Sequence, residues 1–258
     1  MKKLNISLVG IVIVCLGHAI DAQAQLEFST SEIYTCSYVN GSDYDDFSGA
    51  VRNWNRWMDE HNLTAYTGVA LQPYYFSDAL GADLVWLGGW TSGTAEGEHV
   101  SAWISDADAV IEGFNRVVEC PAHSRWAMAE LNPFDSEPGA GTTGMAEFRN
   151  CTLKENRTLD DAVAAFNEWF DFEAGLGVDT GHLMLVPIAG LASDDTYDFK
   201  WVIGFRSYAA YGAAADPMIQ RGGAGRFDQI FENVMTCDSP RVYSMELERV
   251  SDQNQVRP

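Results

Sequence analysis

Two stretches of the chain repeat the same spacing of apolar positions. In each stretch, apolar residues fall at steps 0, 3, 4, 7, 10 and 11, which is the pattern of one helical face. The first series is Phe47, Ala50, Val51, Trp54, Trp57 and Met58, and the second is Leu159, Ala162, Val163, Phe166, Trp169 and Phe170. We therefore predict two similar amphipathic helices over 47–58 and 159–170. Thr158-x-x-Asp161 is typical of a capping box at the start of the second.

Further segments repeat in the same order along the chain. The matched pairs are Asp83-x-x-Trp86-x-x-Gly89-Trp90 with Asp198-x-x-Trp201-x-x-Gly204-Phe205, Phe114-x-x-Val117-Val118-x-Cys120 with Phe231-x-x-Val234-Met235-x-Cys237, and Trp126-x-Met128 with Tyr243-x-Met245. We predict an internal duplication with copies over 25–131 and 146–250. A Pro- and Gly-containing linker over 132–145 joins them.

The apolar runs between the helices predict strands. They lie at Gly68–Gln72, Leu84–Trp90, His182–Val186 and Phe199–Phe205, with further strands ending at Cys36 and Cys151. Several runs are continuously apolar, which is typical of strands buried on both faces. With second helices over 110–118 and 227–235, each copy has the ferredoxin-like order β-α-β-β-α-β.

The two helices of such a unit cover only one face of its sheet, so the other copy must cover the second face. We therefore predict an α+β fold of two tandem ferredoxin-like repeats, packed sheet to sheet about a pseudo-twofold axis.

Cysteine usage points to disulfides. Apart from Cys15, the chain has Cys36, Cys120, Cys151 and Cys237, which allow three pairings. The separations of 84 and 86 residues favour Cys36 with Cys120 and Cys151 with Cys237, one bridge in each copy. Each bridge should join the end of the first strand to the end of the second helix.

The N-terminus is typical of a cleaved secretory signal over residues 1–24. Lys2 and Lys3 precede an apolar run from Leu8 to Leu16, and Ala22-Gln23-Ala24 follows. We expect an exported protein, periplasmic or extracellular and monomeric, with a C-terminal tail over 251–258. The net charge of −21 argues against nucleic-acid partners. No second apolar run approaches the 18 residues of a membrane span, so no membrane insertion is predicted.

This topology and internal symmetry resemble the dimeric α/β-barrel superfamily, here fused in tandem over residues 28–250. The chain also resembles uncharacterised exported proteins of marine bacteria that carry the repeat with paired cysteines. The superfamily includes antibiotic-type monooxygenases, haem-handling enzymes and small-ligand binders. The resemblance therefore implies a barrel without selecting an activity.

Large aromatic side chains share one face of the predicted strands. Trp86 and Trp90 lie four positions apart, as do Trp201 and Phe205. If this face lines the barrel, it forms a cavity for a flat or apolar ligand. Otherwise the rings fill the barrel as core.

Two polar residues are further candidates for ligand binding. His182 is the only histidine in a predicted strand, and its counterpart is Gly68. It could serve as a haem ligand or general base, or be a strand-end histidine bonded to the backbone. Arg206 could hold an anionic ligand or pair with a surplus carboxylate.

The segment Glu96-Gly97-Glu98-His99, with His123, offers carboxylate and imidazole groups. Because these residues lack a fixed metal-ligand spacing, we predict a solvated acidic loop and no metal site.

The sequence contains no Gly-x-Ser-x-Gly, His-Glu-x-x-His or Walker motif. We predict an exported, non-catalytic protein that needs no cofactor. It would bind a small apolar or aromatic ligand in the barrel, or another protein at its outer surface. The alternative is a periplasmic oxidoreductase of the monooxygenase or haem-handling kind. There, His182 would be ligand or base, and Trp86 and Trp201 would line the barrel cavity.

Overall fold

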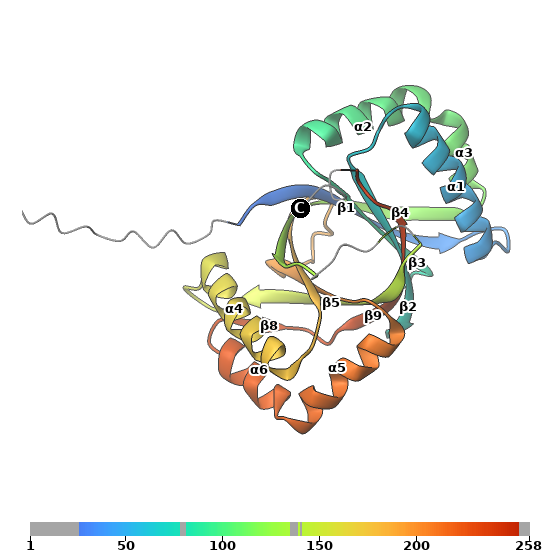
Figure 1. Ribbon diagram of the computed structural model, residues 1–258. Helices are drawn as coiled ribbons and strands as arrows, with labels where there is room; N and C mark the ends of the chain where they lie inside the picture. The colour runs from blue at the N-terminus through green and yellow to red at the C-terminus, as the bar shows by residue number, and fades with distance from the viewer. Residues whose placement is uncertain (1–25, 78–80, 135–138, 140, 253–258) are drawn as a thin grey trace, which may run out of the picture.

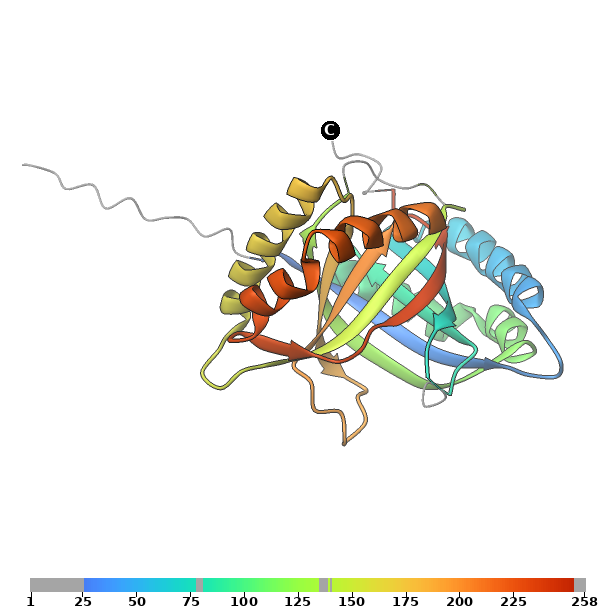
Figure 2. The same cartoon turned by 90° about the horizontal axis from the view of Figure 1, so that it is seen from below.

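Eight antiparallel strands close into a barrel, and all helices lie outside it (Figures 1 and 2). The computed structural model describes residues 26–77, 81–134, 139 and 141–252. The strands are β1 (Phe28–Tyr38), β2 (Tyr66–Tyr75), β3 (Leu84–Trp90), β4 (Val118–Asn132), β5 (Thr143–Leu153), β6 (Gly181–Ala189), β7 (Phe199–Phe205), β8 (Met235–Cys237) and β9 (Arg241–Arg249). The helices are α1 (Tyr44–Glu60), α2 (Gly93–Asp106), α3 (Asp108–Asn115), α4 (Leu159–Leu176), α5 (Tyr208–Gln220) and α6 (Gly223–Phe231).

The strand order is β7-β6-β4-β1-β3-β2-β9-β5, and β5 pairs back to β7. Within this order, the N-terminal half contributes β4-β1-β3-β2 and the C-terminal half contributes β9-β5-β7-β6. The halves join through the antiparallel pairs β2–β9 and β4–β6. They therefore meet along their sheet edges as well as across the barrel interior, not as two stacked sheets.

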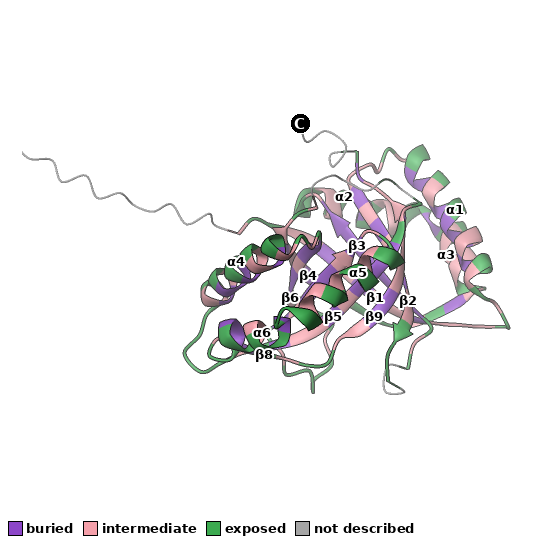
Figure 3. Ribbon diagram, turned by 60° about the horizontal axis from the view of Figure 1, so that its bottom comes forward, coloured by how far each residue is buried: buried purple, intermediate pink, exposed green. Residues whose placement is uncertain are grey.

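Side chains from all eight barrel strands meet inside the barrel. This interior cluster is Ile33, Leu71, Val85, Leu87, Trp126, Ala146, Phe148, Leu185, Val202 and Tyr243. Because strand side chains alternate, the neighbours of these residues point outward to the helices, where two more apolar clusters form. All seven residues of β3 are buried, as its continuous apolar run predicts. Figure 3 shows buried residues along the two long helices, α1 and α4.

The two long amphipathic helices match the sequence pattern. All six apolar positions predicted for α1 are buried, and Asp43 caps its N-terminus. Thr158 and Asp161 form the predicted capping box of α4. In each helix an apolar face packs against the sheet and a side-chain cap satisfies the N-terminus, which explains why these two segments are helical.

Two helices, α2 and α5, are absent from the predicted order. His99 is the only buried residue of α2, and α5 has none, so neither shows an amphipathic stripe. Their start signals are Ser92 and Ser207, whose hydroxyls accept backbone N–H groups in the first turn. The predicted acidic loop over 96–99 is therefore wrong, because this segment belongs to α2. The predicted second helices also end early, since α3 stops at Asn115 and α6 at Phe231.

The predicted cysteine pairs are confirmed. The sulfur atoms of Cys36 and Cys120 are 2.03 Å apart, and those of Cys151 and Cys237 are 2.00 Å apart. The expected attachment to a helix end is wrong. Cys120 lies in β4 and Cys237 in β8, so each bridge joins two neighbouring strands.

Residues 1–24 of the predicted signal lie outside the described residues, as do 135–138 and 140 of the predicted linker and 253–258 of the tail. Residue 132 of that linker belongs to β4, and 143–145 belong to β5. Among the described residues, no helix has the length and hydropathy needed to cross a membrane.

Replacing Cys151 and Cys237 together by Ala should lower the free energy of unfolding by about 2–4 kcal/mol, because the bridge restricts the unfolded chain. Urea denaturation of the oxidised protein measures this loss. The matched Cys36→Ala/Cys120→Ala variant closes a loop of nearly equal length, 84 against 86 residues, and should lose a similar amount. Losses below about 1 kcal/mol in both variants would contradict the expectation.

Candidate functional site

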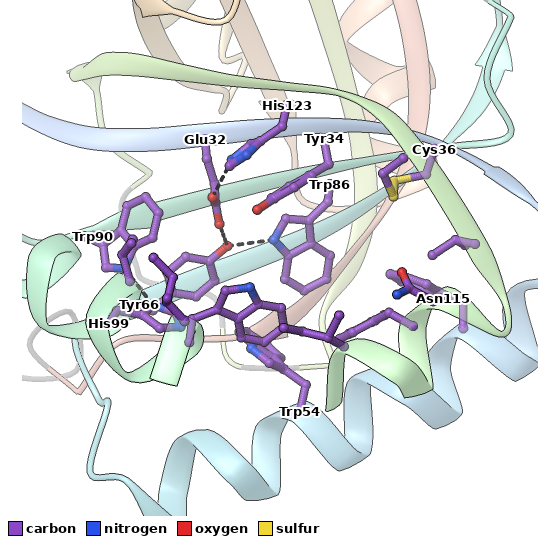
Figure 4. Close-up of a pocket in the computed structure, with 18 residues that line it drawn as sticks. Glu32, Tyr34, Cys36, Trp54, Tyr66, Trp86, Trp90, His99, Asn115 and His123 are labelled. Atoms are coloured by element: carbon purple, nitrogen blue, oxygen red, sulfur yellow. Dashed lines mark hydrogen bonds and ion pairs between the residues drawn. A yellow bond between two sulfur atoms is a disulfide. The ribbon is translucent and has the colours of Figure 1, made fainter. Parts of the chain in front are cut away.

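A cavity of about 510 Å³ lies in the N-terminal half, between the outer face of the barrel and helices α1–α3. Figure 4 shows its wall of aromatic side chains. The rings come from α1, β3, the neighbouring strands and the two following helices, and they are Tyr34, Phe47, Trp54, Tyr66, Trp86, Trp90, Trp103 and Phe114. Such a wall suits a flat or apolar ligand.

Glycines in the strands make room for the two innermost rings. A Cβ added to Gly88 would overlap the hydroxyl group of Tyr66, and one added to Gly68 would overlap the indole of Trp86. Both strand positions must therefore lack a side chain for the Tyr66–Trp86 pair to fold against the sheet.

A carboxylate forms the polar end of the cavity. Glu32 Oε1 accepts a hydrogen bond from the Tyr66 hydroxyl at 2.8 Å, and Oε2 accepts one from His123 Nε2 at 2.8 Å. Trp86 Nε1 donates to the Tyr66 oxygen at 2.7 Å. The ring of His123 stacks on Tyr34 with centroids 3.7 Å apart. Figure 4 shows this chain of bonds along one wall.

Both tyrosines at this end stay neutral. Burial, then the charge of Glu32, raises the pKa of Tyr34 far above its usual range, and burial likewise raises the pKa of Tyr66. The Tyr66 hydroxyl donates its hydrogen bond to Glu32.

His99 of α2 lies at the other end of the cavity. Its Nδ1 accepts the indole N–H of Trp90 at 2.7 Å. Burial lowers the pKa of His99 to about 4, so the imidazole is neutral at pH 7. Because an indole can only donate, the neutral ring carries its proton on Nε2.

The cavity opens beside α2. Val100 and Ile104 line it and are 40% and 75% exposed. A ligand therefore has an approach from solvent along this helix.

In the C-terminal half, side chains fill the corresponding space over Trp201. Phe227 of α6 stacks on Trp201 with centroids 6.1 Å apart and planes 8° apart, and Phe166 lies at 4.8 Å. Phe227 precedes Phe231 by four residues. In α3, the residue four before Phe114 is the smaller Val110.

His182 belongs to this filled side and is fully buried. Its Nδ1 accepts from Trp201 Nε1 at 3.0 Å, and its Nε2 lies 2.8 Å from Glu173 Oε2 and 2.9 Å from Thr180 Oγ1. These side chains, not the backbone alone, satisfy the histidine. No sequence pattern singled out Glu173 as a functional residue, because it lies among the aromatic residues of α4.

Five of the six sequence-predicted ligand-binding residues fall into two separate groups. Trp86 and Trp90 line the cavity, whereas His182, Trp201 and Phe205 belong to the core under α4–α6. Both aromatic strand faces point to the helices, so the expected cavity inside the barrel is wrong.

Two further charged candidates, Arg206 and Glu96, form ion pairs. Arg206 Nε lies 2.8 Å from Asp179 Oδ2, with its guanidinium over the Phe134 ring. Arg125 binds both carboxylate oxygens of Glu96. Among the residues that the structure describes, no cluster of three or more His, Cys, Asp or Glu side chains could hold a metal ion.

No protein-family model matches the chain, and no curated protein matches its sequence. Solved structures do match. A candidate monooxygenase from Fusobacterium nucleatum has a TM-score of 0.57 at 7% identity, covering 87% of this chain and 94% of that one. A candidate monooxygenase from Lactobacillus acidophilus has 0.54 at 13%, covering 86% and 97%. A haem-binding protein from Thermus thermophilus has 0.51 at 11%, covering 86% and 92%. At these identities the likeness shows the dimeric α/β-barrel fold alone.

His99 should make the protein lose stability between pH 6.5 and 4. In this window the unfolded chain binds a proton at His99 and the folded protein does not, so the free energy of unfolding falls as pH falls. His99→Gln keeps an acceptor for Trp90 and should reduce this loss by about 1–3 kcal/mol, measured by urea denaturation at pH 7 and 4.5.

His61 provides the control. Hydrogen bonds to Trp57 and Asp106 raise the pKa of His61, so its contribution is present at low pH and lost as pH rises. His61→Gln should therefore increase the acid loss. An unchanged pH dependence in His99→Gln would show that another group causes the loss.

Proposed function

We propose that the protein binds a small, flat, mostly apolar molecule in the cavity between the N-terminal half of the barrel and α1–α3. One observation carries this proposal. The N-terminal half keeps an open aromatic cavity over Trp86, whereas aromatic rings fill the space over Trp201. The fold does not require such a cavity, because aromatic side chains fill the equivalent space in the C-terminal half.

We also propose that the two halves arose by duplication. The two halves share the order of strands, the matched apolar positions and one disulfide each. We also propose that the protein is exported and monomeric. The disulfide pairs are consistent with an oxidising compartment.

The size of the cavity favours a ligand larger than one ring. Burying roughly 200 Å² of one aromatic ring contributes about 5 kcal/mol before the costs of association. Micromolar affinity needs about 8 kcal/mol after those costs. A two-ring ligand, or one ring with a polar group bonded at the Glu32 end, comes closer to this value than a single ring does.

The second candidate function is an oxidoreductase that acts on such a ligand without haem. The supporting observation is the pairing of Glu32 with His123, whose side chain is 49% exposed. A carboxylate beside an apolar cavity can accept a ligand proton, and a half-exposed imidazole can pass it to water. Turnover of a phenolic ligand under oxygen, lost in Glu32→Gln, would favour this function over simple binding.

The residues present do not fit haem. The neutral rings of His99 and His182 each accept an indole N–H at Nδ1, so the proton sits on Nε2, the nitrogen left for iron. His182 Nε2 also contacts Glu173, and His123 Nε2 contacts Glu32. Neither proposed function uses the cofactor.

Filling the cavity should abolish binding. Ile111 lines the cavity from α3, and Ile111→Trp places a large ring in the ligand space. We expect affinity for the neutral probe N-phenyl-1-naphthylamine to fall at least tenfold, measured by the probe's fluorescence. The matched control is Ile219→Trp on α5, where the side chain is 79% exposed, and it should bind as the natural protein does. Equal probe binding by all three proteins would refute the proposed site.

A further inference from the structure

We propose that the ligand of this cavity is an organic cation, an ammonium group attached to an aromatic or alkyl body, with its charge seated between Glu32 and the indole of Trp86. This inference rests on the proposed function and specifies the ligand class for the same site. It follows from comparing the charges at matched positions in the two halves.

In each half, one strand residue lies opposite a tryptophan of the neighbouring strand. A glutamate stands two residues before that strand residue. In the C-terminal half, Glu147 precedes Arg149, and Arg149 lies opposite Trp201 in the β5–β7 ladder. In the N-terminal half, Glu32 precedes Tyr34, and Tyr34 lies opposite Trp86 in the β1–β3 ladder. The registers are the same, and all these side chains point outward to the helices.

The C-terminal half supplies its own cation. Arg149 Nη2 lies 3.2 Å from Glu147 Oε2, and the guanidinium lies over Trp201 with 5.8 Å between its central carbon and the ring centroid. A carboxylate on one side and an aromatic face on the other stabilise a positive charge. This arrangement is complete within the chain.

The N-terminal half has the carboxylate and the indole but a tyrosine where the arginine would be. Among the described residues lining the cavity there is no Lys or Arg, and Glu32 is the one carboxylate. His123 contacts Glu32 from the strand β4 side, where it is half exposed and stacked on Tyr34. We therefore place the ligand's charge where the cavity borders Glu32 and Trp86.

Several of the hydrogen-bond donors around the cavity are already bonded within the protein. The hydroxyl group of Tyr66 donates to Glu32, and the indole N–H groups of Trp86 and Trp90 donate to Tyr66 and His99. These donors are occupied inside the protein. His99, with its pKa lowered to about 4, adds no positive charge at pH 7.

The ring geometry suits an ammonium group. Trp54 stands perpendicular to Trp86 with centroids 5.4 Å apart and at 77° to Tyr66 with centroids 5.5 Å apart. The walls therefore present ring faces and edges in several directions, and cations bind to tryptophan faces most strongly. The net charge of −21 further raises the concentration of cations near the protein.

Three ligands on one ring system test the charge: 1-naphthylmethylammonium, the neutral 1-naphthylmethanol, and the anionic 1-naphthylacetate. Isothermal titration calorimetry at pH 7.5 and constant ionic strength should give the tightest binding for the ammonium, at least tenfold tighter than the alcohol, and the weakest for the acetate. If the alcohol binds as tightly as the ammonium, the charge inference is wrong and the proposed function stands. If none of the three binds, the proposed function itself fails for this ring system.

Two variants locate the charge. Glu32→Gln should bring the ammonium and alcohol affinities to within about threefold of each other, whereas the matched Glu147→Gln variant should keep the tenfold preference. Tyr34→Arg supplies the internal cation of the other half and should weaken ammonium binding at least tenfold. It also provides the test if Glu32→Gln does not fold, as judged by circular dichroism. An ammonium preference that persists in both Glu32→Gln and Tyr34→Arg would overturn the assignment.

Discussion

The pairing of strand edges between the two halves is the constraint on which the rest of the structure depends. A four-stranded sheet leaves unpaired backbone N–H and C=O groups along its outer strands. Here β2 pairs with β9 and β4 with β6, so each barrel strand has a partner on both sides. Closure turns one face of each sheet inward, and the interior cluster fills it. The outward face must then be covered by helices, and the candidate site lies in that layer.

Because both halves use the same strand register, they present matched positions to different helix layers. Over Trp201, α6 supplies Phe227 and the sheet supplies Arg149, so rings and an internal ion pair occupy the space. On the side of Trp86, α3 has the smaller Val110 at the position of Phe227, and Tyr34 stands at the position of Arg149. The cavity lies on this side. The C-terminal half thus acts as the closed version of the site within one molecule.

Periodicity in the sequence predicted the elements that bury a clear face. The helix over 47–58 and the strands at Leu84–Trp90 and Phe199–Phe205 were accessible to it. The cysteine pairs followed from the matching separations in the two copies, and the barrel was implied by the resemblance to the dimeric α/β-barrel superfamily. A period of two places Trp86 and Trp90 on one strand face but does not say which way that face points. The direction depends on barrel closure, and this is why the cavity was expected inside the barrel.

The polar part of the site was harder to find. Glu32 and Tyr34 lie in a strand whose other residues show no unusual pattern, and they acquire meaning only next to Tyr66 and His123, which come from β2 and β4. One signal was present: Glu32 and Glu147 are both four residues before the first cysteine of their half. The different residues two positions later, Tyr34 and Arg149, mark where the halves diverge.

The placement of the disulfides has a consequence for assembly. Each bridge lies within one half, and a single connection between β4 and β5 carries the chain from one half to the other. The halves are otherwise held by noncovalent ladders and shared core. Two chains that exchanged halves would rebuild the same barrel twice without breaking a sulfur–sulfur bond, so reciprocal swapping into an intertwined dimer is topologically open to this protein.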